Sequence, residues 1–283
     1  MLDLYLVNRL IDLWLAEDIG HGDITSLTMI DAGATATFAM NARQPIAVAG
    51  IDVAAACFRR YDPSVQVEMT AKDGDRVAPK TTLLKISGKA RSLLTVERTA
   101  LNIVQHLSGI ATETARWMDV IKGTKAKLID TRKTTPGLRA LQKHAVICGG
   151  GANHRLGLDS GVMIKDNHIA VCGSISEAVR KAKLAEQALG QSAPALKIEV
   201  ECDTLAQVSE ALEAGADMVL LDNMSLDELR QAVALAGRRA QTEASGGVTR
   251  ESIAAIAATG VNFVSVGRIT QSAPAVDIGL DWS

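Results

Sequence analysis

The stretch from Leu128 to Ile169, near the middle of the chain, is rich in side chains that bind anions. Between Asp130 and His168 it holds six lysine or arginine residues against three aspartates, although the whole chain has a net charge of -2. Arginine can pair with a carboxylate or phosphate through two parallel hydrogen bonds, and lysine and histidine add point charge and transferable protons. We therefore expect a binding site for small polyanions here, rather than a solvated basic face.

A sharp turn follows two of these cations. Arg132 and Lys133 come after a short apolar segment and are followed by Thr-Thr-Pro-Gly at residues 134–137. Proline fixes its own backbone angle and glycine accepts conformations that other residues avoid, so this sequence is typical of a turn. The turn would aim both cations into one space.

Two carboxylates further along the chain are candidates to face these cations. Glu199 and Glu201 stand two apart in a predicted strand and therefore share a face, where buried carboxylates need cations or hydroxyls as partners. Glu201, at the end of the strand, favours a ligand-binding role. For Glu199 a ligand role and a structural ion pair with Lys165 or Lys133 carry equal weight.

A glycine-containing loop is the candidate phosphate site. Ser245-Gly246-Gly247 follows a predicted strand and opens a helical run, so its backbone amides and the helix dipole would bind an anion. Gly267 follows the next strand, between Val266 and Arg268. Phosphate sites of barrel enzymes commonly use their last two strand-helix loops, which favours a single site made by both.

Apolar strands and amphipathic helices alternate from Lys125 onward. The expected strands are residues 127–130, 162–165, 196–201, 218–222, 240–244 and 263–266. Repeats of strand and helix about 20 to 35 residues apart indicate a parallel sheet. Polar residues gather at the carboxyl ends of these strands, where barrel enzymes carry their chemistry. We predict the α/β class, as an incomplete (β/α) barrel.

The first part of the chain has a different pattern, which predicts a smaller α+β domain. A helix is expected over residues 4–15, ended by Gly20, then a strand at 34–40, a helix at 51–61 and a strand at 65–69. Residues 93–121 fit one or two helices, with a break near Ser108-Gly109. We expect the α+β domain over residues 1–110 and the barrel over 111–270, with the tail 271–283 returning to the first domain.

Composition limits the classes of function. The chain is 47% apolar but only 3% aromatic, and no basic stripe with stacking rings suggests a nucleic-acid partner. Charged residues interrupt the first 18 positions and no run of about 18 apolar residues occurs, so we expect a cytoplasmic protein with no signal peptide and no membrane span. The wide spacing of the cysteines suggests neither a zinc site nor a disulfide framework; they are Cys57, Cys148, Cys172 and Cys202.

Three motifs together closely resemble the quinolinate phosphoribosyltransferase family. They are residues 130–137 (DTRKTTPG), 149–158 (GGGANHRLGL) and 164–168 (IKDNH), and matching motifs run from Glu17 to Asp277. The resemblance implies a glycosyltransferase (pentosyltransferase) that transfers the phosphoribosyl group of phosphoribosyl pyrophosphate to quinolinate. The products would be nicotinate mononucleotide, pyrophosphate and carbon dioxide, a step of de novo NAD biosynthesis.

The resemblance also implies roles for individual residues. Lys133, Glu201 and Asp222 would be catalytic, with the two carboxylates holding the ribose hydroxyls directly or through Mg²⁺. Quinolinate and the phosphoribosyl group would contact these three residues together with Arg132, Thr134, His154, Arg155, Lys165 and an Arg98 supplied by a neighbouring subunit. The 5′-phosphate would lie against Ser245, Gly246, Gly247, Val266, Gly267 and Arg268. A shared site requires a homodimer, and a hexamer is the alternative assembly.

Two positions depart from the family pattern, and other functions remain as alternatives. Gly247 stands where the family often has Asn, and Arg268 where a small or apolar residue is usual. The alternatives are a paralogue on the same scaffold, such as a molybdenum-associated pyrophosphorylase-like protein or a nicotinate transferase, a Schiff-base aldolase using Lys165, and a non-catalytic anion-binding regulator.

Overall fold

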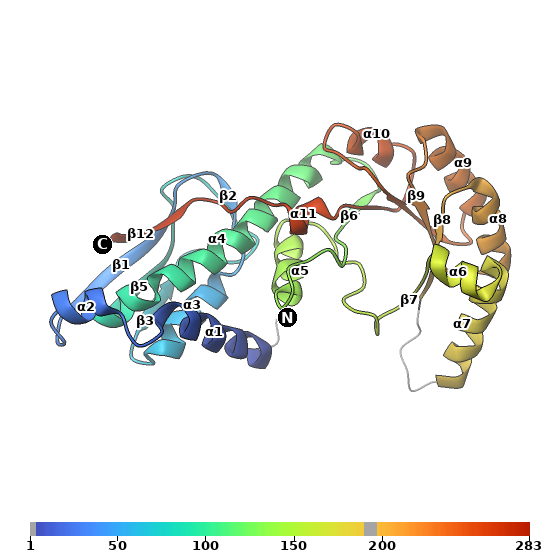
Figure 1. Cartoon of the computed structure of the whole chain (residues 1–283). Coiled ribbons are helices and arrows are strands. Elements are labelled where there is room, and N and C mark those ends of the chain that lie inside the picture. The colour runs from blue at the N-terminus through green and yellow to red at the C-terminus, as the bar shows by residue number, and fades with distance from the viewer. Residues whose placement is uncertain (1–3, 190–196) are drawn as a thin grey trace. The chain divides into compact units, whose positions relative to one another are not determined.

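The computed structural model describes residues 4–189 and 197–283 (Figure 1). The chain forms two compact units. The α+β unit comprises Met1–Ala115, Thr135–Gly150 and Ile269–Ser283, and the barrel unit comprises Arg116–Thr134 and Gly151–Arg268.

The barrel unit contains a six-stranded parallel sheet with the order β6-β11-β10-β9-β8-β7. Its strands are β6 (Lys127–Ile129), β7 (Val162–Ile164), β8 (Ile198–Cys202), β9 (Met218–Asp222), β10 (Gln241–Ser245) and β11 (Phe263–Ser265). The sheet is not closed by pairing between β6 and β7, and Ala152 adds only an isolated parallel bridge beside Ile129. The predicted incomplete barrel is confirmed. Leu196, the first residue of one predicted strand, lies outside the described residues.

Helices between these strands cover the sheet, as the alternating pattern predicted. They are α6 (Asp166–Cys172), α7 (Ile175–Leu189), α8 (Leu205–Ala214), α9 (Leu226–Ala236) and α10 (Ile253–Ala257). A short helix, α11 (Arg268–Gln271), follows β11, and all of it after Arg268 belongs to the α+β unit. α8 shows why these segments are helical: Thr204 and Gln207 form a reciprocal capping box at its start, and Val208, Ala211 and Leu212 form its buried stripe. The loops that follow the strands are therefore held at fixed positions.

The α+β unit is built on an antiparallel sheet with the order β12-β1-β5-β3. Its strands are β1 (Thr35–Ala42), β3 (Gln66–Met69), β5 (Thr82–Lys89) and β12 (Ile278–Trp282), and β2 (Ile46–Ala47) pairs separately with β4 (Arg76–Val77). The helices are α1 (Leu4–Ile19), α2 (Ile24–Met29), α3 (Ile51–Tyr61), α4 (Ala90–Val120) and α5 (Arg139–Cys148); the last turn of α4, from Arg116, belongs to the barrel unit. The C-terminal strand pairs with β1, and Trp282 packs edge-to-face on Phe38 with ring centres 5.4 Å apart.

The predicted break near Ser108-Gly109 is wrong, because α4 is one continuous helix from Ala90 to Val120. These two residues serve packing instead. Ser108 is fully buried and its hydroxyl bonds the backbone of Ala49. A Cβ atom on Gly109 would meet the carbonyl oxygen of Pro274, so glycine lets the returning tail pass close to the helix.

The compact units divide the chain differently from the predicted boundaries, since residues 135–150 group with the α+β unit. The reason is close packing of α5 against α4. Gln142 lies 2.8 Å from His106 of α4 through its amide nitrogen. A Cβ on Gly149 would lie 2.4 Å from the carbonyl oxygen of Ala111, so only glycine allows this approach.

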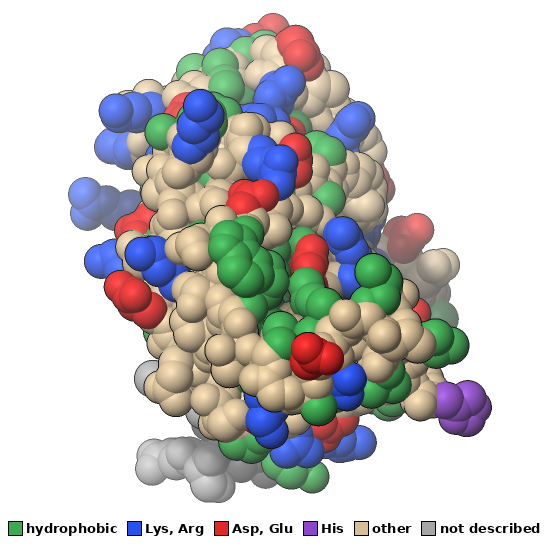
Figure 2. Space-filling model, turned by 90° about the vertical axis from the view of Figure 1, so that its left-hand side faces the viewer, with side chains coloured by type: hydrophobic (Ala, Val, Ile, Leu, Met, Phe, Trp, Pro, Cys, Tyr) green, Lys and Arg blue, Asp and Glu red, His purple; other side chains and the backbone are tan. Residues whose placement is uncertain are grey.

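Within the described residues, no helix is long and apolar enough to cross a membrane. Figure 2 shows one face of the molecule, on which basic and acidic side chains are mixed around a group of hydrophobic ones. No continuous basic stripe is visible on that face.

Candidate active site

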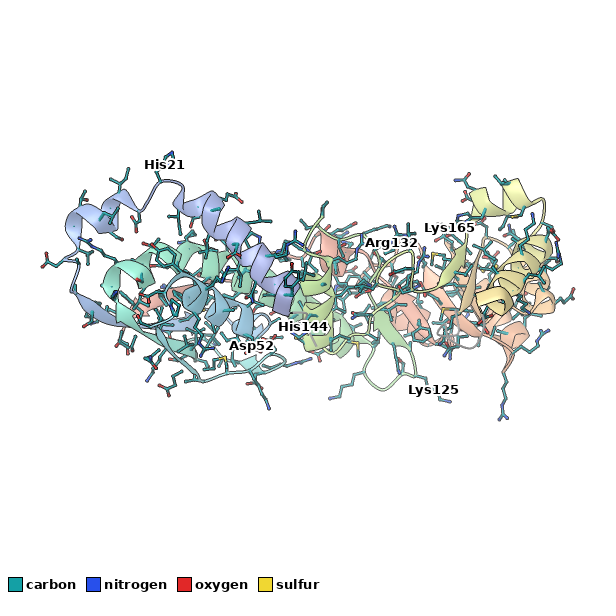
Figure 3. The ribbon with its side chains drawn as sticks, turned by 90° about the horizontal axis from the view of Figure 1, so that it is seen from below. His21, Asp52, Lys125, Arg132, His144 and Lys165 are labelled. Atoms are coloured by element: carbon teal, nitrogen blue, oxygen red, sulfur yellow. The ribbon has the colours of Figure 1, made fainter. Side chains whose placement is uncertain are left out.

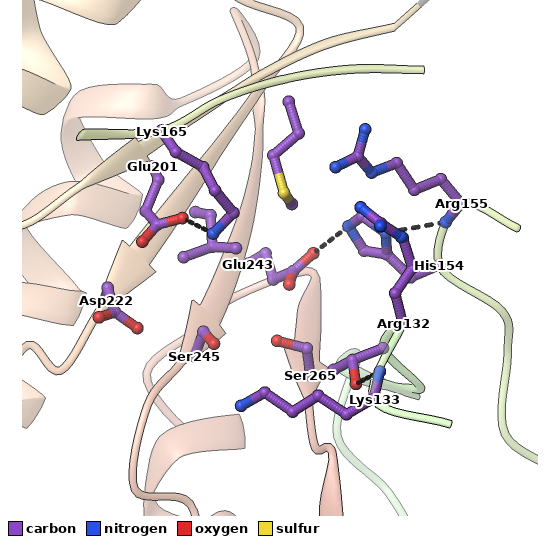
Figure 4. Close-up of a pocket in the computed structure, with 13 residues that line it drawn as sticks. Arg132, Lys133, His154, Arg155, Lys165, Glu201, Asp222, Glu243, Ser245 and Ser265 are labelled. Carbon is purple, nitrogen blue, oxygen red and sulfur yellow. Dashed lines mark hydrogen bonds and ion pairs between the residues drawn. The ribbon is translucent and has the colours of Figure 1, made fainter. Parts of the chain in front are cut away.

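A pocket of about 420 Å³ opens in the barrel unit, where the polar ends of the strands meet. This volume lies in the range of small-molecule sites. Figure 3 shows Arg132 in the loop after β6 and Lys165 after β7, and Figure 4 shows the pocket itself. The residues that line it are Thr131, Arg132, Lys133, His154, Arg155, Met163, Lys165, Glu201, Leu220, Asp222, Glu243, Ser245 and Ser265.

Two carboxylates lie on one side of the pocket. Glu201 forms an ion pair with Lys165. The two residues come from the ends of neighbouring strands, and their opposite charges offset each other. Asp222, at the end of β9, accepts a hydrogen bond of 2.7 Å from the side-chain amide of Asn223. Figure 4 shows Glu201 and Asp222 adjacent to one another. Both carboxylates line the pocket, where polar groups of a ligand can reach them.

The guanidinium groups of Arg132 and Arg155 lie on the opposite side, and the side chain of Lys133 extends toward Ser245 (Figure 4). The backbone of Lys133 donates to Thr131 Oγ1 at 3.0 Å, which fixes the start of the turn. Arg155 donates to the carbonyl oxygen of Gly161 at 3.1 Å. Burial, together with the charge of Arg132, lowers the pKa of Arg155 from its ordinary value. The charge of Glu199 acts in the opposite direction and raises the pKa of Arg155.

A cluster of His154, Glu199 and Glu243 lies beside these cations; His154 and Glu243 line the pocket and Glu199 does not. His154 Nε2 lies 2.9 Å from Glu199 and 3.4 Å from Glu243. Burial alone would lower the pKa of His154, but hydrogen bonds and charge from both glutamates raise it to about 9. The Arg155 backbone N–H, 2.8 Å from Nδ1, opposes protonation, but two close carboxylates outweigh one neutral donor.

Glu199 therefore does not pair with Lys165 or Lys133, the partners suggested from the sequence. It is 6% exposed, and burial raises its pKa despite the bond to His154. A structural ion pair was one of the two roles left open for Glu199. Such a pair is present, but its partner is His154. Its other carboxylate oxygen, Oε1, is buried without a hydrogen-bond partner.

The glycine loop after β10 is shaped by close contacts. Gly246 has a φ of +89°, and a Cβ there would lie 2.3 Å from Asn223 Oδ1. Gly247 also has a positive φ, of +57°. A Cβ on Gly267 would lie 2.8 Å from Lys133 Cδ, so the loop after β11 leaves room for the lysine stem.

The structure brings together eight of the residues predicted from the sequence, which all line the pocket: Arg132, Lys133, His154, Arg155, Lys165, Glu201, Asp222 and Ser245. Six others belong to the barrel unit without lining it: Thr134, Gly246, Gly247, Val266, Gly267 and Arg268. Val266 is buried and Arg268 is exposed. Arg98 is exposed on α4 in the α+β unit.

Sequence reasoning missed five lining residues: Thr131, Met163, Leu220, Glu243 and Ser265. A signal for Glu243 existed, because it stands two residues before Ser245 in β10, as Glu199 stands two before Glu201 in β8. Residues two apart on a strand share a face. The same rule applied to β10 would have placed Glu243 beneath the loop serine.

Comparison with known proteins gives matches over nearly the whole chain. The family model for the quinolinate phosphoribosyl transferase C-terminal domain matches residues 110–281, and that for the N-terminal domain matches residues 23–108. A nicotinate-nucleotide pyrophosphorylase (carboxylating) from Mycobacterium leprae is 45% identical, with 94% of this chain and 94% of the relative covered. A probable enzyme of the same name from Bacillus subtilis is 42% identical, with coverage of 97% and 93%.

Solved structures agree with these matches. The nicotinate-nucleotide pyrophosphorylase of Francisella tularensis superimposes with a TM-score of 0.95 at 40% identity, covering 100% of this chain and 98% of that one. The protein of that name from Ehrlichia chaffeensis gives a TM-score of 0.87 at 42% identity, with coverage of 97% and 98%.

Proposed function

The chain belongs to the quinolinate phosphoribosyl transferase family, and from this we infer that it transfers the phosphoribosyl group of phosphoribosyl pyrophosphate to quinolinate with loss of carbon dioxide. The product, nicotinate mononucleotide, is a precursor of NAD. The observation that carries this function is the pocket of the barrel unit, in which cations face a pair of carboxylates.

The cationic side of the pocket suits a pyridine with two adjacent carboxylates. Arg132, Arg155 and His154 would pair with the diacid, because guanidinium groups bind carboxylates through two parallel hydrogen bonds and His154 carries charge below about pH 9. Lys165 would add a fourth cation once the substrate competes with Glu201 for it. Lys133, which points toward Ser245 in Figure 4, would lie between the diacid and the phosphoribosyl group.

The carboxylate side suits the sugar. Glu201 and Asp222 would hold the ribose hydroxyls and stabilise the positive charge that develops at the anomeric carbon as pyrophosphate leaves. The loop of Ser245, Gly246 and Gly247, with Val266, Gly267 and Arg268, would bind the 5′-phosphate through backbone N–H groups. The helix dipole expected from the sequence does not act at Gly247, because α10 begins only at Ile253. Thr134 would contact the substrate from the turn after β6.

Magnesium fits this side of the pocket, because Glu201 and Asp222 offer the oxygen ligands that Mg²⁺ prefers. When bound with phosphoribosyl pyrophosphate, Mg²⁺ would neutralise charge on the departing pyrophosphate. The protein's own task is to orient the ring nitrogen toward the anomeric carbon.

Ribosylation prepares the second step. As the ring nitrogen bonds to the sugar it becomes cationic, so the bond to the neighbouring carboxylate can break with its electron pair left on the ring carbon. A proton then replaces the lost carbon dioxide. The fixed cations hold the remaining carboxylate while this occurs, so that orientation and a preorganised field supply the catalysis.

We propose that the active unit is a homodimer, or a hexamer, with Arg98 completing the site of a neighbouring subunit. Arg98 is exposed on α4 and does not line the pocket of the barrel unit. The α+β unit also exposes apolar side chains on α2, at Ile24, Leu27 and Met29, which suits contact with a second copy. The cytoplasmic location predicted from the sequence also stays a proposal.

The ion pair between Lys165 and Glu201 speaks against the Schiff-base alternative, since an amine that attacks a carbonyl must be uncharged. The test of the proposed function is an acceptor comparison. Purified protein with phosphoribosyl pyrophosphate and Mg²⁺ should convert quinolinate to nucleotide and leave nicotinate unchanged. Equal use of nicotinate, which has one carboxylate, would refute a site built for a diacid.

A further inference from the structure

A second cluster of ligating side chains lies in the α+β unit and includes none of the residues that line the barrel pocket. Asp73, His144 and Cys148 bring a carboxylate oxygen, an imidazole nitrogen and a thiol sulfur within 4.8 Å of one another. His144 Nε2 lies 2.6 Å from Asp73 Oδ2 and 3.4 Å from Cys148 Sγ.

The backbone holds these three groups in place. His144 and Cys148 stand four apart on α5 and therefore share one helix face (Figure 3 labels His144). Asp73 is oriented by its other oxygen, which accepts the backbone N–H of Ile51 at 3.0 Å. The turn of Asp73 is fixed by the next residue, because the N–H of Gly74 donates to the carbonyl of Val48 at 2.8 Å.

The cluster is half-buried, and part of its surface remains exposed to solvent. The side chain of Asp73 is 15% exposed and that of His144 28%, so a small ion can reach the three donor atoms. Burial, and then the charge of Asp73, raises the pKa of the Cys148 thiol to about 12. Without a cation the sulfur therefore keeps its proton.

From this arrangement we propose that Asp73, His144 and Cys148 form a binding site for one zinc-like divalent metal ion. Zinc takes sulfur, nitrogen and oxygen ligands in tetrahedral geometry, with bonds of about 2.0 to 2.3 Å. Such bonds separate neighbouring ligand atoms by roughly 3.3 to 3.6 Å. The sulfur-nitrogen distance already fits, and the nitrogen-oxygen distance must widen by roughly 0.7 Å.

The charges balance without another reactant. Binding the ion releases the thiol proton of Cys148 to solvent and moves the imidazole proton of His144 from Nε2 to Nδ1, which frees the Nε2 lone pair. Asp73 binds as the carboxylate, and water takes the fourth position. The metal would join α5 to the turn between β3 and β4, so its expected role is to stabilise the α+β unit.

The test is metal binding by the whole protein after treatment with a chelator. Co²⁺ added to this apoprotein should give sulfur-to-cobalt charge-transfer absorption with one ion per chain, and Zn²⁺ should abolish the absorption by displacing Co²⁺. Zinc should also raise Tm and protect one thiol from alkylation. Cys148→Ala should lose the charge-transfer band, and Asp73→Asn should bind Co²⁺ at least about tenfold more weakly, since it removes one anionic ligand.

Cys172→Ala is the matched control, because Cys172 is also a half-buried free thiol but lies outside the cluster. It should keep the band, the stoichiometry and the zinc-dependent rise in Tm. Circular dichroism and Tm of each metal-free variant show whether it is folded. If folded Cys148→Ala keeps the band, or if the unaltered protein binds no Co²⁺ at ion concentrations well above its own, the cluster is a hydrogen-bond network and the proposal is wrong.

Discussion

At the scale of single residues, the charge of His154 depends on two neighbouring carboxylates. Glu199 and Glu243 contact the same ring nitrogen, and their combined effect raises its pKa to about 9. Because this value lies above the ordinary one of about 6.5, the ion pairs stabilise the fold fully below about pH 6.5 and are lost as pH rises through about 9. Asp130 fixes the backbone at this position by accepting the N–H of His154 at 3.0 Å.

We predict that quinolinate binding follows this titration. KM for quinolinate should rise above pH of about 9, by about tenfold for each further pH unit, because the neutral ring no longer attracts the diacid. Glu243→Gln removes one of the two raising charges and should move this rise toward neutral pH. The check is KM against pH for both proteins.

Glu213→Gln is the control for this change, because Glu213 is exposed and does not line the pocket. Its profile should coincide with that of the unaltered protein. An unchanged profile in Glu243→Gln would show that the charge of Glu243 does not act on His154.

Sequence patterns predicted the polar residues that end the strands. They did not predict the distant residues that contact the site and shift its pKa values. Lys165, Glu201 and Asp222 could be predicted because each closes an apolar strand. The contact of His154 with Glu243 joins residues 89 positions apart by their numbers, and no local spacing encodes it. The same holds for Asp73 and His144, which are 71 apart.

At the scale of elements, the loop between β10 and α10 depends on glycine for two reasons. Gly246 has a positive φ, and the side chain of Asn223 occupies the space that a Cβ would need. Gly123 has nearly the same φ, +88° against +89°, but no atom lies within 4 Å of its Cβ position. Comparing alanine substitutions at Gly246 and Gly123 therefore separates the cost of backbone strain from the cost of steric contact.

Gly246→Ala should therefore be more harmful than Gly123→Ala. Both should lose about 1 kcal/mol from backbone strain, and Gly246→Ala should lose about 1 to 2 kcal/mol more and raise KM for phosphoribosyl pyrophosphate about tenfold or more. Urea unfolding and steady-state kinetics measure both. Equal losses with unchanged KM would mean that the Asn223 contact and the loop's phosphate role are both mistaken.

Helix α4 gives a case in which helix propensity predicts the wrong sign. Alanine is usually favoured over glycine inside a helix by about 1 kcal/mol. At Gly109 the added Cβ would lie 2.2 Å from the backbone oxygen of Pro274, so Gly109→Ala should instead destabilise by about 2 to 3 kcal/mol. Asn102→Ala, at an exposed position of the same helix, should stabilise slightly. Urea titration decides, and a stabilised Gly109→Ala would contradict the packing.

The element pattern explains which parts of the fold could be predicted. The parallel strands were found because each is a short apolar run with a polar end, as in β9, where Val219, Leu220 and Leu221 are buried before Asp222. The continuity of α4 was missed because glycine usually interrupts helices, and the partner that requires Gly109, residue 274, is distant in sequence.

At the scale of the whole molecule, the proposed shared site predicts complementation. Arg98→Ala and Lys133→Ala should each be nearly inactive, because each removes one cation from every site. When the two are mixed in equal amounts with subunit exchange, random dimers hold about one quarter of their sites intact. Activity should recover to about one quarter of the unaltered level.

Lys122→Ala replaces Lys133→Ala in the control mixture, since Lys122 does not line the pocket. In the mixture of Lys122→Ala with Arg98→Ala, every site that receives Arg98 from a Lys122→Ala subunit should be active. Tagged subunits show whether exchange has occurred. If exchange occurs and the mixture of Arg98→Ala with Lys133→Ala is no more active than either variant alone, Arg98 does not contribute to the site of a neighbouring subunit.

The measurement that tests the central claim most directly follows quinolinate labelled in its 2-carboxylate. With purified protein and Mg²⁺, labelled carbon dioxide should appear only when phosphoribosyl pyrophosphate is present, and in equal amount to nicotinate mononucleotide, because the ring must be ribosylated before the carboxylate can leave. Release of carbon dioxide without phosphoribosyl pyrophosphate, or nucleotide that keeps the label, would contradict the account.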